Sequence, residues 1–239
     1  MTRYVFIPDL HGRATKLHAA LRAFGGPGVH WVLLGDLTGS DTGSTESWEI
    51  FRALRQLAFR QPLTLLWGDQ DLLAAQSRLE HSAESAAAWS NGPGRATRAG
   101  YRVHHPRAEA QLNDDLRWLH DLALNDVLIQ QGGLTLLAAH AGRPPLTARA
   151  PQPGTPPPSA AAPAWISRAD GHPLASGIHA SVHGHHPGLR VRLTPDSRYL
   201  LASTDPFSVN VLTLDPHGLN TWNLGVDDAH PRRSAPIPE

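Results

Sequence analysis

The sequence contains no cysteine among its 239 residues. Disulfide bonds and thiolate metal sites are therefore excluded. Acidic and basic residues are equal in number, 21 of each, so the chain has no excess positive charge for binding nucleic acid. No apolar run reaches the roughly 18 residues that a membrane-spanning helix needs. The N-terminus lacks a signal-peptide pattern, because its apolar stretch, residues 4–7, is short and Asp9 follows closely. We expect a cytoplasmic protein with no membrane or nucleic-acid partner.

Histidine is abundant, with 15 residues. A chain that is rich in imidazole and carboxylate but lacks thiolate offers ligands suited to Mn, Fe or Zn. The length fits one large domain, and a 41% share of hydrophobic residues is enough to bury a sizeable core.

Three apolar segments in the N-terminal third predict buried strands, at residues 4–7, 30–34 and 63–67. Each is followed by a polar loop that contains an aspartate, namely Asp9, Asp36 or Asp69. Apolar residues at helical spacing predict intervening helices at residues 14–24 and 45–59, and a longer, alanine-rich helix at about 72–89. Because sites in open α/β sheets collect at the carboxyl ends of strands, we expect the three aspartates to converge.

The second half of the chain predicts a helix at residues 108–122 and a hairpin of residues 127–129 and 134–138, which leads into His140. Residues 144–163 are rich in proline and alanine, and we expect a mobile loop. A strand at residues 180–182 precedes His185. Four later β-like runs, at 189–193, 199–202, 209–214 and 219–224, are interpreted as an antiparallel meander. We expect one domain over residues 1–226 and a frayed tail over 227–239.

The order of these polar residues is more specific than any one of them. Asp9 and His11 are two positions apart in a strand-exit loop, so their side chains can chelate one ion together. Asp36 and Asp69 leave the next two strands, and His140 and His185 follow two more. Hydrolysis of a phosphate ester needs an activated water and neutralised phosphoryl oxygens, and two metal ions about 3.5–4 Å apart supply both. Carboxylates and neutral imidazoles are ligands for such a pair. Taken singly, each residue could instead be a helix cap, a turn residue or a core histidine.

In this order the motifs resemble those of the calcineurin-like phosphoesterase superfamily, in particular its phosphoprotein-phosphatase branch. That branch includes bacterial Ser/Thr phosphatases and symmetrical diadenosine tetraphosphate hydrolases. The family patterns G-D-x-H-G, G-D-x-x-D-R-G, G-N-H-[ED], H-A-G and G-H-T-P correspond to residues 8–12, 35–41, 68–71, 140–142 and 184–187. Residues 116–119 and 165–168 are softer matches. The resemblance spans about residues 3–205.

The resemblance implies an α/β fold, a four-layer α/β/β/α sandwich of two mixed sheets flanked by helices. It also implies two divalent metal ions, of which we expect Mn²⁺, with Fe or Zn as alternatives. Asp9, His11 and Asp36 would bind one ion, and Asp36 would bridge to a second ion bound by Asp69, His140 and His185. A water between the ions would attack phosphorus in line, and Arg168 of the W-x-x-R segment would bind phosphate.

Three departures from the family pattern bear on activity. Asp69 replaces the family asparagine and adds a negative charge to the site. Gln70 replaces the histidine that helps to protonate the leaving oxygen, a contribution worth about 10²–10⁴-fold. Asp71, that histidine's partner, is then expected to cap the following helix. The arginine of the D-R-G motif is missing, and Arg143 is a candidate substitute. His186 or His183, which flank His185, could replace the missing acid.

Three functions remain open from the sequence. The first is a phosphohydrolase acting on small phosphate esters or nucleotides, because all six ligand positions carry ligating residues. The second is a phosphoprotein phosphatase, which the missing arginine, the missing acid and the proline-rich loop support less. The third is a catalytically impaired member that binds a phosphorylated ligand with metal or serves as an interaction module, a function that Gln70 and Asp69 favour. Protein partners cannot be inferred from the sequence.

Overall fold

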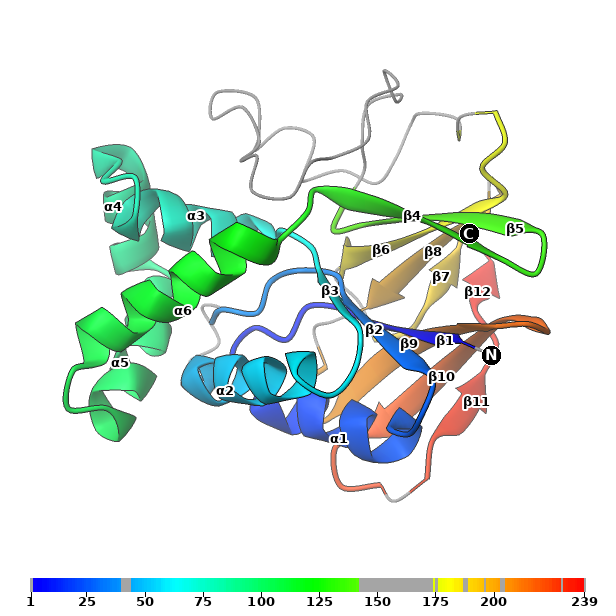
Figure 1. Cartoon of the computed structure of the whole chain (residues 1–239), viewed down its shortest axis with the longest axis horizontal. Helices are drawn as coiled ribbons and strands as arrows, with labels where there is room; N and C mark the ends of the chain where they lie inside the picture. The colour runs from blue at the N-terminus through cyan, green and yellow to red at the C-terminus, as the bar shows by residue number, and fades with distance from the viewer. Residues whose placement is uncertain are drawn as a thin grey trace.

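The computed structural model describes residues 2–39, 44–141, 174, 176–186, 189–195, 197–202, 205–228 and 230–238. The proline-rich segment at 144–163 and the motif at 165–168 lie outside these residues. Two six-stranded mixed sheets pack face to face, and six helices complete the described part of the chain (Figure 1).

The first sheet has the strand order β11-β10-β9-β1-β2-β3. Strands β1, β2 and β3 are parallel, whereas β9 runs antiparallel to β1, and β10 runs antiparallel to β9. The bounds are β1 (Arg3–Ile7), β2 (Val29–Leu33), β3 (Leu63–Leu65), β9 (Ser208–Asp215), β10 (Gly218–Gly225) and β11 (Arg232–Ser234).

The second sheet has the strand order β12-β7-β8-β6-β5-β4. Strands β4 and β5 form the expected hairpin, and β5, β6 and β8 are parallel neighbours. The bounds are β4 (Asp126–Gln131), β5 (Leu134–Ala139), β6 (Ala180–His186), β7 (Arg192–Leu193), β8 (Arg198–Ala202) and β12 (Ile237–Pro238).

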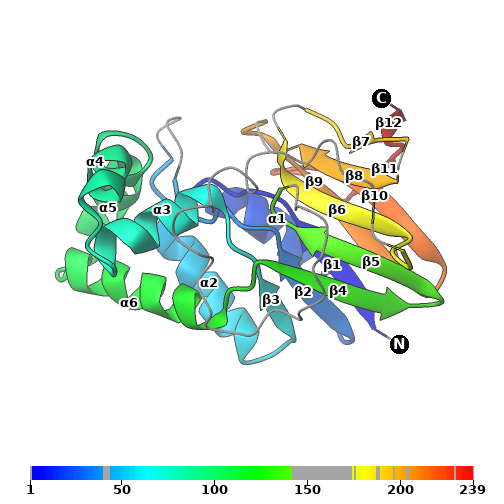
Figure 2. The same ribbon diagram turned by 90° about the horizontal axis from the view of Figure 1, so that it is seen from above.

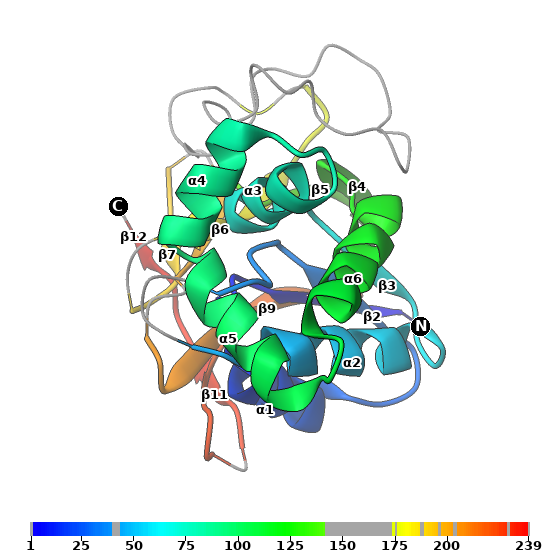
Figure 3. The same ribbon diagram turned by 90° about the vertical axis from the view of Figure 1, so that its left-hand side faces the viewer.

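The described helices share one apolar core with the first sheet. They are α1 (Ala14–Phe24), α2 (Ser47–Ala58), α3 (Asp69–Arg78), α4 (Ala83–Asn91), α5 (Gly94–His104) and α6 (Ala108–Leu122). Figure 3 shows α3–α6 in front of the ends of the strands, with α1 and α2 along one side of the sheet. Within the described residues, no helix lies over the outer face of the second sheet, where the expected sandwich has its fourth layer (Figure 1). Among the described helices, none is both long and apolar enough to cross a membrane.

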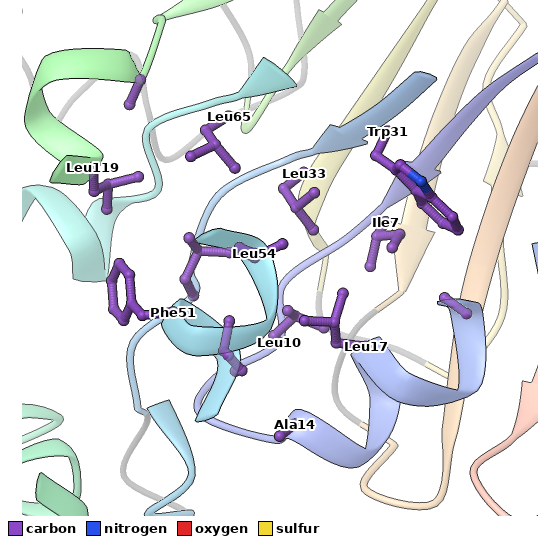
Figure 4. Packing of buried hydrophobic residues seen from close by; sticks show 14 of the residues in the cluster. Ile7, Leu10, Ala14, Leu17, Trp31, Leu33, Phe51, Leu54, Leu65 and Leu119 are labelled. Atoms are coloured by element: carbon purple, nitrogen blue, oxygen red, sulfur yellow. The ribbon is translucent and has the colours of Figure 1, made fainter. Parts of the chain in front are cut away.

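Strand β1 shows why the sheet is buried on both faces. Val5 and Ile7 pack into the core shared with the helices, together with Leu17 of α1 and Leu54 of α2 (Figure 4). Phe6, which points the opposite way, packs into the core between the two sheets. Because both faces of the first sheet are covered by apolar side chains, the carboxyl ends of its strands are held rigidly.

The structure corrects the sequence prediction in three places. The single helix expected at about 72–89 is two helices, α3 and α4, because Ser82 begins a new helix by accepting a hydrogen bond from Ser85 N–H. The four C-terminal runs are not one meander, since β7 and β8 join the second sheet while β9 and β10 join the first. The tail expected to be frayed contributes β11 and β12, because an edge strand is held by backbone hydrogen bonds and needs no apolar side chains.

Candidate metal centre

All six side chains expected to bind metal lie at or just beyond the carboxyl ends of strands. Asp9 and His11 follow β1, Asp36 follows β2, and Asp69 is the first residue of α3, four positions after β3. His140 follows β5, and His185 is the penultimate residue of β6. These strand ends belong to both sheets and meet on one side of the sandwich, facing the helices α3–α6 (Figure 2). The parallel strands therefore bring residues up to 176 positions apart into contact.

His140 lies at the middle of the cluster and is 2% exposed. Its Nε2 atom is 3.3 Å from Asp69 Oδ1, 3.8 Å from Asp36 Oδ1 and 3.2 Å from His185 Nδ1. Its Nδ1 atom is 2.7 Å from the carbonyl oxygen of Leu34, which can only accept a hydrogen bond. Nδ1 therefore carries the proton, and the lone pair of neutral His140 lies on Nε2, toward the carboxylates.

His11 joins the cluster from the other side. Its Nε2 atom is 3.6 Å from Asp9 Oδ2, and its Nδ1 atom is 3.7 Å from Asp36 Oδ2. Nδ1 is buried and has no hydrogen-bond partner among the described residues. A buried imidazole nitrogen without a partner, beside two carboxylates, is suited to a cation between them.

Four ligand atoms, one each from Asp9, Asp36, His140 and His185, lie within 4.8 Å of one another. His11 and Asp69 flank this group. His11 Nε2 is 3.6 Å from Asp9 Oδ2, and Asp69 Oδ1 is 3.3 Å from His140 Nε2. A group of this span is suited to holding a metal ion, and the mixture of carboxylate oxygens and imidazole nitrogens suits Mn, Fe or Zn. The residues present therefore fit a bound divalent metal ion.

Three of these residues have left-handed backbone conformations, which are costly for a non-glycine residue. The φ angles are +47° at His11, +51° at Asp36 and +46° at His185. Such strain costs about 1–3 kcal/mol per residue and persists only where the surroundings enforce it. At His185 the backbone N–H donates to both carboxylate oxygens of Asp9, at 3.0 and 3.1 Å. These hydrogen bonds fix the loop and orient Asp9 together.

Two glycines allow the strand ends to approach this closely. A Cβ atom on Gly68 would lie 2.1 Å from Asp36 Oδ1, and one on Gly184 would lie 2.3 Å from Asp9 Oδ1. Real Cβ atoms do not approach other atoms so closely, so either side chain would displace a candidate ligand. Both glycines precede a ligand in sequence, and their place in the motifs is explained by this lack of space.

The charges in the cluster are unbalanced without a cation. Burial, together with the charges of Asp69 and Asp9, raises the pKa of Asp36 well above its usual value. Burial also acts to raise the pKa of Asp69, but hydrogen bonds with His140 and His185 outweigh burial and lower it. Burial acts to lower the pKa of His140, but the charge of Asp9 and contact with Asp69 raise it overall. Burial lowers the pKa of His11, so its imidazole is neutral and available as a ligand. Bound divalent cations would compensate the crowded carboxylates.

Asp71 does not cap α3, so that prediction is wrong. The N-cap position is Gly68, and the carboxylate of Asp71 accepts hydrogen bonds from Leu37 N–H at 3.0 Å and Thr38 N–H at 2.9 Å. Asp71 is fully buried and therefore ties α3 to the loop that carries Asp36. The sequence contains no signal for this role, because the two donors are backbone groups more than 30 positions away.

The candidates for phosphate binding and acid catalysis are not placed by the structure. Arg143 and Arg168 lie outside the described residues, and of His186 only the backbone is described, at the end of β6. His183 is buried, and its ring nitrogens are 3.0 Å from the carbonyl oxygen of Ala141 and 2.8 Å from Ser181 Oγ. Both nitrogens of His183 are engaged within the second sheet, so it is a poor candidate for the replacement acid.

Lys16 of α1 is a buried cation that was not predicted from the sequence. Its side chain is 1% exposed, and burial, reinforced by the charge of Arg13, lowers its pKa to about 8, although the charges of Asp9 and Asp205 act to raise it. A helical position between apolar neighbours gave no reason to single it out.

Solved structures with similar folds include phosphatases. A Ser/Thr phosphatase from Saccharomyces cerevisiae, with similarity to human phosphatase PP5, matches with a TM-score of 0.60 and 14% identity, over 99% of this chain and 80% of that one. A putative diadenosine tetraphosphatase matches with a TM-score of 0.54 and 17% identity, over 95% of both chains. A cold-active protein-tyrosine phosphatase from a Shewanella species matches with a TM-score of 0.54 and 14% identity, over 98% of this chain and 80% of that one.

The fold is that of the calcineurin-like phosphoesterases. The α/β fold class expected from the motifs, with two mixed sheets and flanking helices, is therefore confirmed. No model of a known protein family matches the sequence, and no curated protein sequence matches it. At 14–17% identity these phosphoesterase structures establish the fold, and the chemistry has to be argued from the cluster itself.

Proposed function

We propose that this chain is a dinuclear-metal phosphohydrolase that cleaves small phosphate esters or nucleotides. The observation that carries the proposal is the cluster of three carboxylates and three imidazoles at the carboxyl ends of β1, β2, β3, β5 and β6, on a phosphoesterase fold. We assign Asp9, His11 and Asp36 to one ion and Asp69, His140 and His185 to the other, with Asp36 between them. Manganese is the metal that we expect.

The two ions would supply a Lewis acid for the phosphoryl oxygens and a water nucleophile at neutral pH. The chain's own residues hold the geometry. Leu34 O fixes the tautomer of His140, the backbone N–H of His185 orients Asp9, and the backbone N–H of Gln70 donates to Asp36 Oδ1 at 2.9 Å. Arg168 and Arg143 remain our candidates for phosphate binding, and His186 remains the candidate acid.

An impaired, non-catalytic member is the alternative that a specific observation favours. Gln70 stands where the family carries its acid, and an amide has no titratable proton. Such a protein would bind a phosphorylated ligand through the metals without turnover. A phosphoprotein phosphatase has less support, because a serine alkoxide is a poor leaving group that depends on the missing acid. The cytoplasmic location and the single domain over residues 1–226 also stay predictions.

Hydrolysis of p-nitrophenyl phosphate with added Mn²⁺ tests the proposal, because this leaving group needs little help from an acid. We expect turnover that depends on metal and is lost in Asp9→Asn. Protein with two bound ions and no turnover would refute the hydrolase and leave the binder. Turnover that survives Asp9→Asn would refute the metal mechanism. The matched control is Asp114→Asn, which changes an exposed aspartate on α6 and should leave the rate unchanged.

A further inference from the structure

A cavity of about 510 Å³ lies at the β10–β11 edge of the first sheet, beside the β6–β7 connection. Its walls include Asp205, Ser208, Asn210, Asn223 and Ser234, and two arginines, Arg190 and Arg232, contribute exposed side chains. A volume in the range of about 300–1,000 Å³ is typical of a site for a small organic ligand. Nothing in the candidate metal centre uses these residues.

The sequence of β9 shows that this end of the strand is built differently from the rest. Leu212 and Leu214 face the second sheet and belong to the core between the sheets. Because side chains alternate along a strand, Ser208 and Asn210 point to the same side as these leucines. Both are polar, and Asn210 is 2% exposed. Burying polar side chains on a core face is costly unless they are hydrogen-bonded. Their presence at this end of β9 therefore indicates the wall of a binding site.

A hydrogen-bond network holds the walls in place. Asn223 pairs with Asn210 across the β9–β10 ladder, and its Nδ2 donates to Asn210 Oδ1 at 3.2 Å and to Ser208 Oγ at 3.3 Å. Ser208 Oγ in turn donates to Asp205 Oδ2 at 2.6 Å. Both amide hydrogens of Asn223 are thereby engaged, and its carbonyl oxygen remains an acceptor.

Ser234 of β11 is also part of the cavity wall. Its Oγ atom is buried and has no hydrogen-bond partner among the described residues. A buried hydroxyl without a partner is costly, and a ligand oxygen reached by rotation of this side chain would satisfy it.

The cavity is close to the candidate metal centre. Phe6 of β1 pairs with Leu212 of β9, so continuing this antiparallel register places Asn210 beside Pro8, which precedes Asp9. His185 and Arg190 of the cavity wall are five positions apart in the sequence. The charges of Asp9 and Asp205 both act on Lys16, so the two carboxylates are near the same ammonium group.

We propose that this cavity binds the sugar-phosphate part of a nucleotide whose terminal phosphoryl group lies at the metal centre. The amide and hydroxyl groups match sugar hydroxyls, and Arg190 and Arg232 match the charge of the retained phosphate. The reaction of the bound nucleotide rests on the proposed hydrolase function. Binding of the nucleotide in the cavity does not.

The substrate class then agrees with Gln70. Water adds to the terminal phosphorus, the P–O bond of the anhydride breaks, and the bridging oxygen stays with the retained nucleotide. The released proton goes to solvent. The leaving group is a phosphate, which is stable as an anion and needs no proton from a histidine at position 70.

Equilibrium binding of AMP to the whole protein in EDTA tests the cavity without the metal centre. Inorganic phosphate, adenosine and ribose 5-phosphate are measured beside it. We expect AMP and ribose 5-phosphate to bind more tightly than phosphate or adenosine alone. Arg190→Gln and Asn223→Leu should each weaken AMP binding about tenfold, the loss expected for one charge-assisted or buried hydrogen bond. Arg117→Gln, at an exposed position of α6, is the matched control and should bind like the unchanged protein.

The outcomes separate this proposal from the proposed function. AMP affinity that is unchanged in both cavity variants, or no stronger than phosphate affinity, would overturn the cavity assignment. Arg190 is exposed, so its variant keeps the test valid if Asn223→Leu does not fold. Binding that is lost in the cavity variants supports the site even if the protein turns over no p-nitrophenyl phosphate. Turnover of that ester without AMP binding refutes the cavity and leaves the hydrolase.

Discussion

The side-chain amide of Gln70 donates a hydrogen bond to Asp69 Oδ2 at 3.0 Å. The backbone N–H of the same residue donates to Asp36 Oδ1 at 2.9 Å. Gln70 therefore holds two candidate metal ligands, one for each ion, in the place where the family pattern has a histidine. Its Oε1 atom is buried and has no hydrogen-bond partner among the described residues. Gln70 is thus a positioning residue, and it cannot donate a proton to a leaving group.

Gln70→His should restore the missing acid. We expect hydrolysis of an alkyl phosphate to become faster, by up to about 10²-fold, while hydrolysis of p-nitrophenyl phosphate changes little. The ratio of kcat/KM for the two esters is the measurement, because it cancels any change in metal content. An equal change for both esters would exclude the missing proton donor as the cause of weak activity.

Gly184→Ala should remove metal binding at Asp9. The new Cβ atom would lie 2.3 Å from Asp9 Oδ1, so the carboxylate has to move away from His140. Calorimetric titration with Mn²⁺ measures the loss. The control is Gly133→Ala in the β4–β5 turn, where φ is +82° and nothing lies within 4 Å of the new atom. That variant should lose only the roughly 1–2 kcal/mol of backbone strain and bind metal normally. Normal metal binding by Gly184→Ala would contradict the described approach of β6 to β1.

Asp71→Asn tests the link between α3 and the Asp36 loop. The two carboxylate oxygens of Asp71 each accept one backbone hydrogen bond, whereas asparagine has a single side-chain oxygen. Either Leu37 N–H or Thr38 N–H therefore loses its partner. We expect the free energy of unfolding to fall by about 1–3 kcal/mol. Urea denaturation measures it. The control is Asp121→Asn on the exposed end of α6, which should change stability little. A helix cap at Asp71 would instead predict an almost neutral substitution, since asparagine caps as well as aspartate.

Lys16 should make stability depend on pH in the alkaline range. Burial lowers its pKa in the folded chain to about 8, against 10.5 when unfolded. Between these values the unfolded chain binds more protons, so stability rises with pH above 8, by up to about 3 kcal/mol for the full shift. The pKa of Tyr101 is raised by burial and the charge of Asp115, which opposes this only above about pH 10. Urea denaturation from pH 7 to 9.5 should show the rise in the unchanged chain and not in Lys16→Met. A rise of the same size in both would assign it to other groups.

The sequence predicted the parts of the site that follow from local patterns. Each of Asp9, Asp36 and Asp69 comes after a short apolar strand, and the parallel arrangement of such strands is enough to bring them together. The role of Asp71 could not be predicted, because its partners are backbone N–H groups of another loop. The division of the C-terminal strands between the two sheets was also hidden. Short alternating runs look alike in either sheet, and only the strand pairing distinguishes them, since β9 pairs with β1 whereas β8 pairs with β6.

The metal content of the protein tests the proposed centre most directly. The metal-free protein is titrated with Mn²⁺ while bound metal and thermal unfolding are followed. We predict two ions per chain and a higher unfolding temperature, since a ligand at 100 times its Kd adds about 2.7 kcal/mol of stability. Asp36→Asn should be more stable than the unchanged chain without metal, because it removes a buried carboxylate beside Asp9 and Asp69, and it should gain little from Mn²⁺. No metal binding by the unchanged chain, or the same two ions and the same stabilisation in Asp36→Asn, would contradict the dinuclear centre.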